Sequence, residues 1–391
     1  MSTNERIFYA CQSVSITHMG AAGAGAVATT NMVHGLQSVG ITTNFNLEQA
    51  FELGQIEIYE NIEGTPDVEV TLEKVLDGDP LIYHLATTAV DGTPAGSGVA
   101  GRSKARSDLR LGIFPDNFNN IAAGGNPAEA EVYCSGMYVS SISYTLPVDG
   151  SATESVTLVG NNKQWIKGIG NTSTVAADVA DFHGSDEPLA MGAADSPSGG
   201  ISQREDVLLS GCILPASIQG VNGTGYANGL NTSTKVPRIH IQNVSVSTDF
   251  SREDILELGR KTPYARPATF PIEVSCEIEA ITSSGDFVNA YEFGDPSLYR
   301  STASGNNTSN EDIFLYTRGG LALDLGSANR LASVTYGGGD AAGGNASCTY
   351  SYTNFNDLDV QMRINGYCGH EHLKGVATQK YGDLPLAVHE A

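Results

Sequence analysis

The side chains best suited to bind a metal ion lie near the end of the sequence. Cys368, His370 and His372 alternate with other residues, so in an extended segment they would share one face. Thiolate and imidazole are zinc ligands, but a structural zinc site needs four ligands and the sequence has no second cluster of this kind. We therefore expect these residues to form a loop that binds no metal.

A glycine pattern near the start of the chain could indicate nucleotide binding. Gly23, Gly25 and Ala28 form GxGxxA after a predicted strand, but a dinucleotide site needs a helix directly after this loop. No helical run of useful length follows. No GxSxG, HExxH or Walker sequence occurs elsewhere, so we expect neither an enzyme nor a bound cofactor.

The chain is strongly acidic, with 44 acidic and 21 basic side chains and a formal net charge of -23. Proteins that hold DNA tightly spread lysine and arginine over a face, and this composition does the reverse. Either the acidity serves solubility, or it forms a surface past which DNA slides without sticking. Four carboxylates in alternating strands are the candidates for such a surface: Glu69, Glu73, Glu273 and Glu277.

One basic concentration stands against this acidic background. It consists of Arg102, Lys104, Arg106 and Arg110. A contact to the acidic face of a neighbouring subunit is favoured over a contact to phosphate. The six cysteines are spread without close pairs and are expected to be free, mostly buried thiols. Cross-links between subunits through exposed cysteines stay open.

The elements that carry these residues occur twice. Residues 37–54 (QSVGITTNFNLEQAFELG) and 242–259 (QNVSVSTDFSREDILELG) are identical at eight of 18 positions. Further matches follow in the same order: VEVTLE (68–73) with IEVSCE (272–277), GDPLIY (78–83) with GDPSLY (294–299), and SISY (141–144) with SVTY (333–336). A collinear series of this kind indicates a duplicated domain.

Each copy predicts many short strands, because stretches of Val, Ile, Thr and Tyr are separated by Gly, Ser and Asn. Two alternating runs around a Gly-rich turn predict hairpins at 140–160 and 332–352. The predicted fold class is mainly β, with two tandem β-sandwich or half-barrel domains, each with a short flanking α-helix. The predicted boundaries are 1–165 and 205–370 for the domains, 166–204 for a linker or surface excursion, and 371–391 for a C-terminal arm.

The two helices are expected at 46–54 and 251–259. Asn46 and Ser251 suit the N-cap position, while Gly54 and Gly259 suit the left-handed position that ends a helix. Long Gly-rich loops precede the strongest strands in both copies. No run of 18 apolar residues occurs, so no membrane span is expected.

This order of elements resembles the tail-tube proteins of tailed bacteriophages. The resemblance rests on a long loop, a strand ending in Phe, a capped segment ending in Glu-Leu-Gly, and a Pro-preceded strand at 68–73 or 272–277. More particularly, it is to the long form in which two tube domains are fused. It implies a structural virion protein whose stacked rings form the hollow tube for genome ejection, in a tail assembled in the bacterial cytoplasm.

The resemblance also implies partners. We expect a homo-oligomer, preferably a trimeric ring with pseudo-sixfold symmetry and otherwise a hexamer, together with other tail proteins and transient passage of DNA. Rings of this family stack through long loops, which makes six glycines candidates for ring stacking: Gly20, Gly23, Gly25, Gly220, Gly223 and Gly225.

Two other interpretations stay open. A duplicated β-sandwich can also serve as an adhesin, a carbohydrate-binding module or a decoration subunit of a virion or fibre. Such proteins usually present aromatic platforms, and this chain has one Trp and 7% aromatic residues. The inner tube of a contractile injection system is a second alternative within the same broad class.

Overall fold

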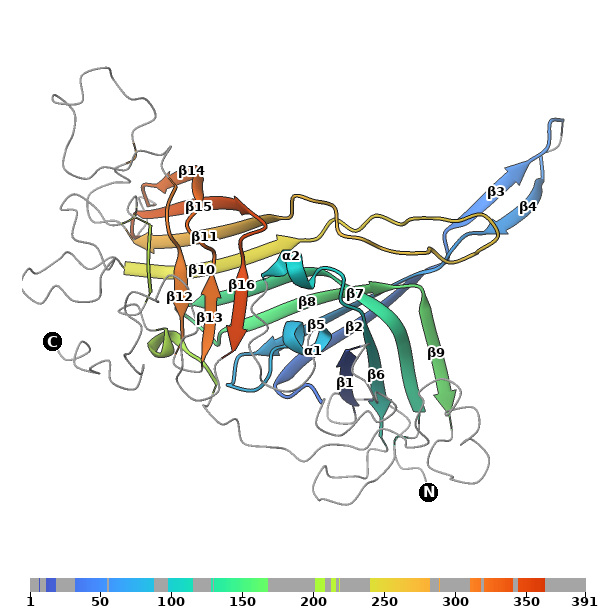
Figure 1. Ribbon diagram of the computed structural model, residues 1–391, viewed down its shortest axis with the longest axis horizontal. Helices are drawn as coiled ribbons and strands as arrows, with labels where there is room; N and C mark the ends of the chain where they lie inside the picture. Colours follow the sequence, from blue (N-terminus) through green and yellow to red (C-terminus); the bar gives the residue numbers. More distant parts are fainter. Residues whose placement is uncertain are drawn as a thin grey trace, which may run out of the picture.

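The central element is a long antiparallel sheet to which both halves of the chain contribute (Figure 1). Its strands lie in the order β14-β15-β11-β10-β7-β8-β5-β2. The first four come from the second half of the chain and the last four from the first half. The computed structural model describes residues 7, 12–18, 32–54, 56–87, 98–114, 128, 130–167, 201–207, 212–215, 218, 240–281, 288, 310–317, 320–339 and 344–362.

The strands of this main sheet are β2 (Leu36–Asn44), β5 (Asp67–Val75), β7 (Ala130–Pro147), β8 (Thr153–Gly160), β10 (His240–Asp249), β11 (Glu273–Ile281), β14 (Arg330–Gly337) and β15 (Ser347–Phe355). The N-terminal part of β7 also pairs with β6 (Ser107–Ile113), which pairs with β1 (Gln12–His18), and with β9 (Asn162–Lys167). A small sheet contains β12 (Phe314–Tyr316), β13 (Leu321–Asp324) and β16 (Asp359–Met362), and a separate hairpin contains β3 (Leu47–Phe51) and β4 (Ile58–Glu63).

Helical structure is sparse in the described residues. It comprises α1 (Ile82–Thr87), α2 (Val99–Arg102) and a 3-10 turn at Arg204–Asp206. The prediction of a mainly β chain is confirmed, and its strands form large antiparallel sheets. The described residues show α-helices only in the first half of the chain, at α1 and α2.

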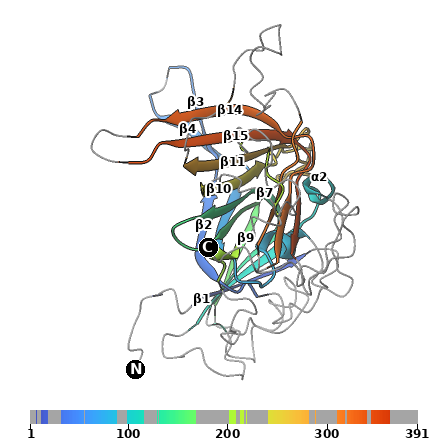
Figure 2. The same ribbon diagram turned by 90° about the vertical axis from the view of Figure 1, so that its left-hand side faces the viewer.

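One face of the main sheet is covered. Strand β5 illustrates the pattern, since Val68, Val70 and Leu72 are buried while Glu69 and Glu73, which alternate with them, are exposed. Figures 1 and 2 place α1, α2 and the small sheet on the same side of the main sheet. The apolar side chains therefore meet between these layers, and each large one contributes about 1.5–3 kcal/mol to the free energy of folding.

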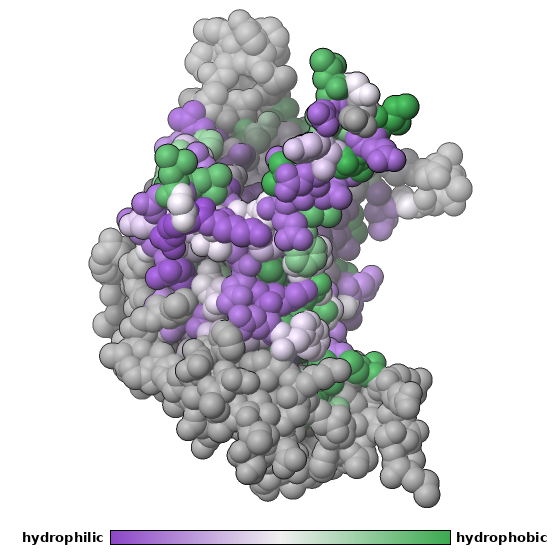
Figure 3. Space-filling view, turned by 90° about the vertical axis from the view of Figure 1, so that its right-hand side faces the viewer, coloured by the Kyte–Doolittle hydropathy of each residue, from purple (hydrophilic) through white to green (hydrophobic). Residues whose placement is uncertain are grey.

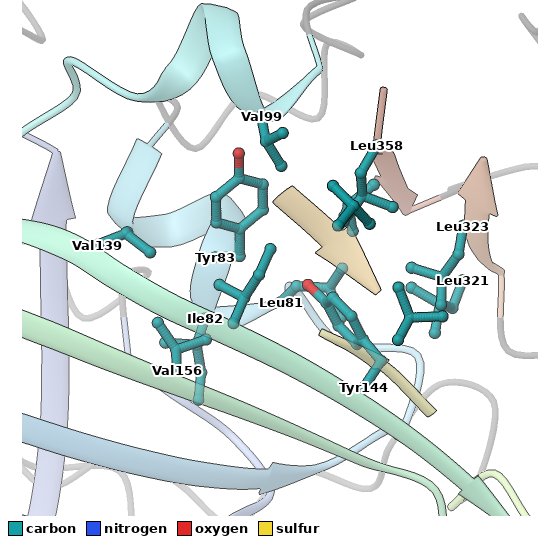
Figure 4. Close-up of a cluster of buried hydrophobic side chains, with 14 of the residues drawn as sticks. Leu81, Ile82, Tyr83, Val99, Val139, Tyr144, Val156, Leu321, Leu323 and Leu358 are labelled. Atoms are coloured by element: carbon teal, nitrogen blue, oxygen red, sulfur yellow. The ribbon is translucent and has the colours of Figure 1, made fainter. Parts of the chain in front are cut away.

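Helix α1 lies in the middle of this core (Figure 4). Its Ile82 and Tyr83 pack between Val139 and Val156 of the main sheet and the leucines of β13. The buried carboxylate of Glu154 on β8 accepts hydrogen bonds from the backbone N–H groups of Ile82 (2.8 Å) and Tyr83 (3.1 Å). These bonds satisfy donors that a helix N-terminus leaves free. Burial raises the pKa of Glu154, although the same hydrogen bonds lower it.

The two halves pair their strands in the same order. Strand β2 pairs with β5 as β10 pairs with β11, and β7 pairs with β8 as β14 pairs with β15. Both β2 and β10 carry a one-residue irregularity, at Gln37 and Gln242 respectively. Strands β7 and β14 carry one at Ser140 and Ala332. These irregularities fix which residues are equivalent.

The predicted match of 68–73 with 272–277 needs a correction. Ile41 pairs with Val70 in the first half, and its equivalent Val246 pairs with Cys276 in the second. Val70 is therefore equivalent to Cys276, which lies two residues beyond the position given by the letter match. The face of each strand is unchanged, because side chains alternate with a period of two.

The predicted helices at 46–54 and 251–259 are wrong. Residues 47–51 form strand β3. Residues 251–259 contain isolated bridges and a turn at 258–259, and the bridge between Ile255 and Ala265 is equivalent to the pair Ala50 and Glu60 in the β3–β4 hairpin. Both segments belong to arms that project from the main sheet (Figure 1).

The residues taken for helix caps have a different role in these arms. Asn46 (φ 47°) and Ser251 (φ 44°) adopt left-handed conformations, and their N–H groups donate to the side chains of Asn44 (3.1 Å) and Asp249 (2.7 Å). Local side-chain hydrogen bonds of this kind favour turns over helices. Gly54 (φ 89°) does have the expected left-handed conformation, but near the tip of a hairpin.

Candidate assembly site

The two halves meet inside the main sheet at the junction of β10 and β7. Val246 lies opposite Tyr144, and Thr248 lies opposite Ile142. All four side chains are buried on the covered face. The backbone N–H of Phe250 continues this ladder by donating to the carbonyl of Ser140 at 2.8 Å. The junction is therefore a regular antiparallel ladder with a packed apolar face.

The two ends of the same sheet carry the equivalents of these strands. Strand β2, equivalent to β10, forms one end, and β14, equivalent to β7, forms the other. Within the described residues, no strand pairs with the outer side of either one. Tyr336 on β14 is 52% exposed, whereas its equivalent Tyr144 is 0% exposed. Ile41 and Val334 are likewise less buried than Val246 and Ile142.

Two arms project beyond the sheet. We define arm 1 as residues 45–66, which include β3 and β4, and arm 2 as residues 250–271. Large apolar side chains are exposed on both of them: Phe45, Leu47, Phe51, Leu53, Ile56, Ile58, Tyr59 and Ile62 on arm 1, and Ile255, Leu256, Leu258, Tyr264 and Phe270 on arm 2. Figure 3 views the end of the molecule toward which the arms project and shows apolar patches there. Exposed apolar groups gathered in this way mark an interaction surface.

Arm 2 is fixed to the first half of the chain by Arg252. The Arg252 guanidinium donates to the backbone carbonyl oxygens of Val139 (2.7 and 2.9 Å), Ser103 (2.6 Å) and Arg266 (3.0 Å). It also lies over the ring of Tyr138, 5.1 Å from its centroid. Burial lowers the pKa of Arg252 to about 10, which leaves it charged at neutral pH. The equivalent residue of arm 1 is the exposed Leu47.

The two arms contact each other within the chain. The Thr65 hydroxyl, at the base of arm 1, donates to the carbonyl oxygen of Lys261 near the tip of arm 2. Arg266 forms ion pairs with Asp67, the first residue of β5, and with Asp254 of its own arm (2.5 Å). Lys261 and Glu63 form a longer, exposed pair at 3.9 Å. Arm 2 therefore reaches along the first half as far as the base of arm 1.

The uncovered face of the main sheet carries the four predicted carboxylates. Strand alternation places Glu69 and Glu73 of β5 on the same face as Glu273 and Glu277 of β11, and all four are exposed. The Ser38 hydroxyl donates to Glu73 at 3.3 Å. Among the lysines and arginines of the eight strands, Lys74 is buried in an ion pair with Asp77 on the covered side and Arg330 begins β14. The uncovered face is thus acidic and hydroxyl-rich.

Several other predicted sites fall outside the residues that the structure describes. The six stacking glycines, the GxGxxA pattern and Cys368, His370 and His372 are outside the described residues. In the part of the chain that the structure describes, no group of His, Cys, Asp and Glu could hold a metal ion. No helix in those residues is long and apolar enough to cross a bilayer.

The basic concentration is divided, because Lys104 and Arg106 are exposed while Arg102 and Arg110 are internal. Arg110 is buried and forms an ion pair with Glu131 at 2.7 Å. Arg102 is buried as well, with its guanidinium 5.6 Å from the centroid of the Tyr83 ring. These two side chains support the first half and do not form a phosphate-binding surface. Four cysteines in the described residues are buried: Cys134, Cys212, Cys276 and Cys348.

The arms were missed by the sequence analysis, although a signal for them exists. Phe45, Leu47, Phe51 and Leu53 recur at odd positions, and Ile56, Ile58 and Ile62 recur at even positions. A period of two indicates strands. The capping pattern outweighed this signal and led to the wrong element. The carboxylate of Glu279, which shares the uncovered face of β11, was missed as well.

No protein-family model matches the sequence, and no curated protein matches it. Three solved structures are similar to parts of the chain. The anti-feeding prophage cap, a tube terminating cap, is 11% identical, with a TM-score of 0.28 over 43% of this chain and 95% of its own. The sheath-tube complex of the PVC extracellular contractile injection system, in the extended state, is 10% identical, with a TM-score of 0.29 over 42% of this chain and 95% of its own.

The third structure is an Hcp protein. It is 10% identical to this chain, with a TM-score of 0.21 over 40% of this chain and 98% of its own. All three alignments therefore cover almost the whole of the other chain and less than half of this one. With TM-scores of this size, the similarity supports neither a family nor a function.

Proposed function

We propose that this chain is the tail-tube subunit of a bacteriophage, and that it assembles into stacked rings forming a hollow tube through which DNA passes. One observation carries the proposal. The junction of β10 with β7 is made inside the chain, while the equivalents of the same two strands stand open at the two ends of the sheet. The same junction can therefore form between chains, with β2 of one chain against β14 of the next.

An open sheet end is otherwise a liability. Exposed N–H and C=O groups of an edge strand recruit other strands, and closing the sheet removes the edge altogether. A contact between two different surfaces of one chain closes into a ring when the rotation per subunit allows it. Pairing β2 with β14 leaves no free edge in the main sheets of such a ring.

The internal junction also gives the expected register. Val246 lies opposite Tyr144 and Thr248 opposite Ile142, so Ile41 should lie opposite Tyr336 and Thr43 opposite Val334 of the next chain. These pairs would bury the apolar side chains that are partly exposed on β2 and β14. We expect these side chains to pack between chains as their buried equivalents pack at the internal junction.

Strand spacing favours three chains per ring. Three chains contribute about 24 main-sheet strands, and a spacing of ~4.8 Å gives a wall with a backbone diameter of ~37 Å before strand tilt widens it. Six chains would roughly double this diameter. A trimer with pseudo-sixfold symmetry therefore gives the narrower pipe, with every main-sheet strand in one wall.

The uncovered face of the sheet is assigned to the lumen. The covered face bears α1, α2 and the small sheet, and these layers need the greater room outside a closed wall. DNA carries one negative charge per ~1.7 Å of its axis. A lumen lined by Glu69, Glu73, Glu273 and Glu277 would repel the DNA and allow it to slide.

A proline at the chain-to-chain edge tests the assembly. Because the N–H of Phe250 bonds to β7 and strand hydrogen bonds alternate, the N–H of the equivalent Phe45 and that of Thr43 point out of the β2 edge. Thr43→Pro removes an outward donor, whereas Thr43→Val keeps it. In negative-stain micrographs we expect annular particles or hollow filaments for the unchanged chain and for Thr43→Val, and single chains for Thr43→Pro.

The outcomes separate the alternatives. Tubes built by a folded Thr43→Pro variant would contradict the edge pairing. Discrete monomers of the unchanged chain that bind glycans on an array would replace the proposal with the carbohydrate-binding module. Circular dichroism of the variants checks that the sheet is retained.

A further inference from the structure

We propose that the arms form a continuous head-to-tail belt around the ring, in which the tip of arm 1 of one chain docks on the base of arm 2 of the next chain. This inference rests on the proposed ring. It adds a second chain-to-chain contact, separate from the sheet edge, and identifies its partner as another copy of this chain.

The contact of arm 2 with arm 1 inside the chain supplies the geometry. Lys261, two residues beyond the left-handed Gly259, meets Thr65 just before β5 begins. Arg266 lies farther along the same arm and reaches Asp67. Arm 2 thus crosses from its own half to the base of the arm in the other half.

The arms are equivalent residue by residue. The pair Leu47 and Glu63 in arm 1 corresponds to the bridge between Arg252 and Ala268 in arm 2, with an offset of 205 (252 − 47). The pair Ala50 and Glu60 corresponds to Ile255 and Ala265 with the same offset. If β2 pairs with β14 of the next chain as β10 pairs with β7, arm 1 must extend toward the base of arm 2 of that chain.

The residues in contact between chains are predicted by replacing each residue of the internal contact with its equivalent from the other half. Ile56 of arm 1 takes the place of Lys261. On the next chain, Phe270 takes the place of Thr65 and Ala268 takes the place of Glu63. The contact inside the chain is polar at these positions, whereas the contact between chains is apolar on both sides.

Exposure agrees with this assignment. Thr65 and the neighbouring Gly64 are partly covered, whereas Phe270 is 52% exposed. Ile56 and Leu53 at the tip of arm 1 are fully exposed. Ile56 and Phe270 are therefore exposed where the next chain would meet them, whereas Thr65, the equivalent of Phe270, is partly covered and bonds to the Lys261 carbonyl.

The polar pair of the internal contact also has a counterpart. Asn61 is equivalent to Arg266, and the sheet register makes Glu273 equivalent to Asp67. The side-chain amide of Asn61 is neutral, unlike the guanidinium of Arg266, but it can still donate a hydrogen bond to the carboxylate of Glu273 on the next chain. Arm 1 of one chain and the base of arm 2 of the next are thus compatible in both apolar and polar positions.

Paired cysteines test the belt. In a background in which Cys11 and Cys368 are replaced by serine, Ile56→Cys with Phe270→Cys places one thiol on each side of the proposed contact. The matched control is Thr65→Cys with Lys261→Cys, which places the thiols across the observed internal contact. Purified assemblies are oxidised mildly and run on denaturing gels without reductant, and the same samples are imaged by negative-stain microscopy.

We expect the first pair to give a ladder of multimers that ends at the number of chains in one ring. The control pair should stay at the mass of one chain, and each single cysteine variant should also stay there. Rings in the micrographs without a ladder for the first pair would overturn the belt and leave the proposed function standing. Absence of annular particles from the unchanged chain would overturn both.

Discussion

Phe45 and Phe250 occupy equivalent positions directly after β2 and β10, yet Phe250 is 1% exposed and Phe45 is 60% exposed. The difference arises because Phe250 lies at the junction with β7 and Phe45 lies at the open edge. The same position of the two halves is therefore buried where the strand has a neighbour, as at the β10–β7 junction, and exposed where it has none.

The first prediction concerns these two residues. Phe250→Ala should lower the free energy of unfolding by about 3–5 kcal/mol, since it opens a cavity in a packed core. Phe45→Ala should change it by less than about 0.5 kcal/mol in the isolated chain, yet reduce ring formation. Urea unfolding of the monomer and micrographs of assembled protein measure the two effects. Equal destabilisation by both changes would contradict the equivalence.

The second prediction concerns Arg252. Arg252→Leu, which installs the residue found at the equivalent Leu47, leaves the carbonyl oxygens of Val139 and Ser103 without their donor. The free energy of unfolding should fall by about 2–4 kcal/mol, and amide hydrogen exchange should speed up in residues 250–271. Arg252→Lys should recover only part of the loss, because an ammonium group lacks the planar fork that reaches several carbonyl oxygens. Unchanged exchange in arm 2 would show that Arg252 does not anchor it.

The third prediction concerns pH. Burial, assisted by the charge of Arg102, lowers the pKa of His84 from 6.5 to about 4, although its hydrogen bond to the Val360 carbonyl opposes the shift. Above pH 6.5 the imidazole is neutral in both states. As the pH falls from 6.5 toward 4, the unfolded chain takes up a proton that the folded chain does not, so stability falls by up to about 3 kcal/mol.

The variant His84→Gln isolates this effect. It keeps a donor for the carbonyl oxygen of Val360 but cannot take up the proton. Urea unfolding of both proteins between pH 7 and pH 4 should show a smaller acid loss for the variant. Parallel curves for the two proteins would exclude His84 as the cause.

The fourth prediction concerns the proposed lumen. Glu277→Lys replaces a carboxylate on the uncovered face of β11, and tubes of this variant should retain double-stranded DNA at low salt and release it as salt rises. The exposed Glu205 gives a control with the same change of charge outside this face, as Glu205→Lys. Filter binding of labelled DNA to purified tubes measures retention. Equal retention by both variants would contradict a lumenal position for Glu277.

The fifth prediction transfers the internal arm contact to the chain boundary. Ile56→Lys alone should weaken assembly, because it places a charge against Phe270. Ile56→Lys combined with Ala268→Glu and Phe270→Thr recreates the residues of the internal contact and should restore part of the assembly. Sedimentation velocity of matched samples gives the fraction in rings. No recovery by the triple variant would argue against the equivalence of the two contacts.

The sequence allowed the strands to be predicted better than their partners. Alternation identified the β7–β8 and β14–β15 hairpins. It also indicated that Glu69, Glu73, Glu273 and Glu277 lie on the polar faces of their strands, because side chains alternate between the two faces of a strand whatever its neighbours are. The joining of β10 to β7 could not be predicted, because side-chain patterns on two strands do not state which strands pair. It is a long-range contact made by backbone groups that every residue carries.

The arms show a different limit. Asn46 and Ser251 have the composition of helix caps, but the same side-chain and backbone groups also form the turns seen here. Local chemistry was compatible with either structure. The leucines and isoleucines that follow were interpreted as the apolar side of a helix. In the structure of the single chain they are exposed on the arms.

In the proposed trimeric ring, the linkage of two halves into one polypeptide would make the junctions within a chain differ from those between chains. Half of the junctions would be covalently tethered and polar in the arms, and half would be separable and apolar. A ring stacked on this one would then meet a surface that repeats every third of a revolution instead of every sixth. That restricts the angular settings of successive layers and would give the filament a defined helical pitch.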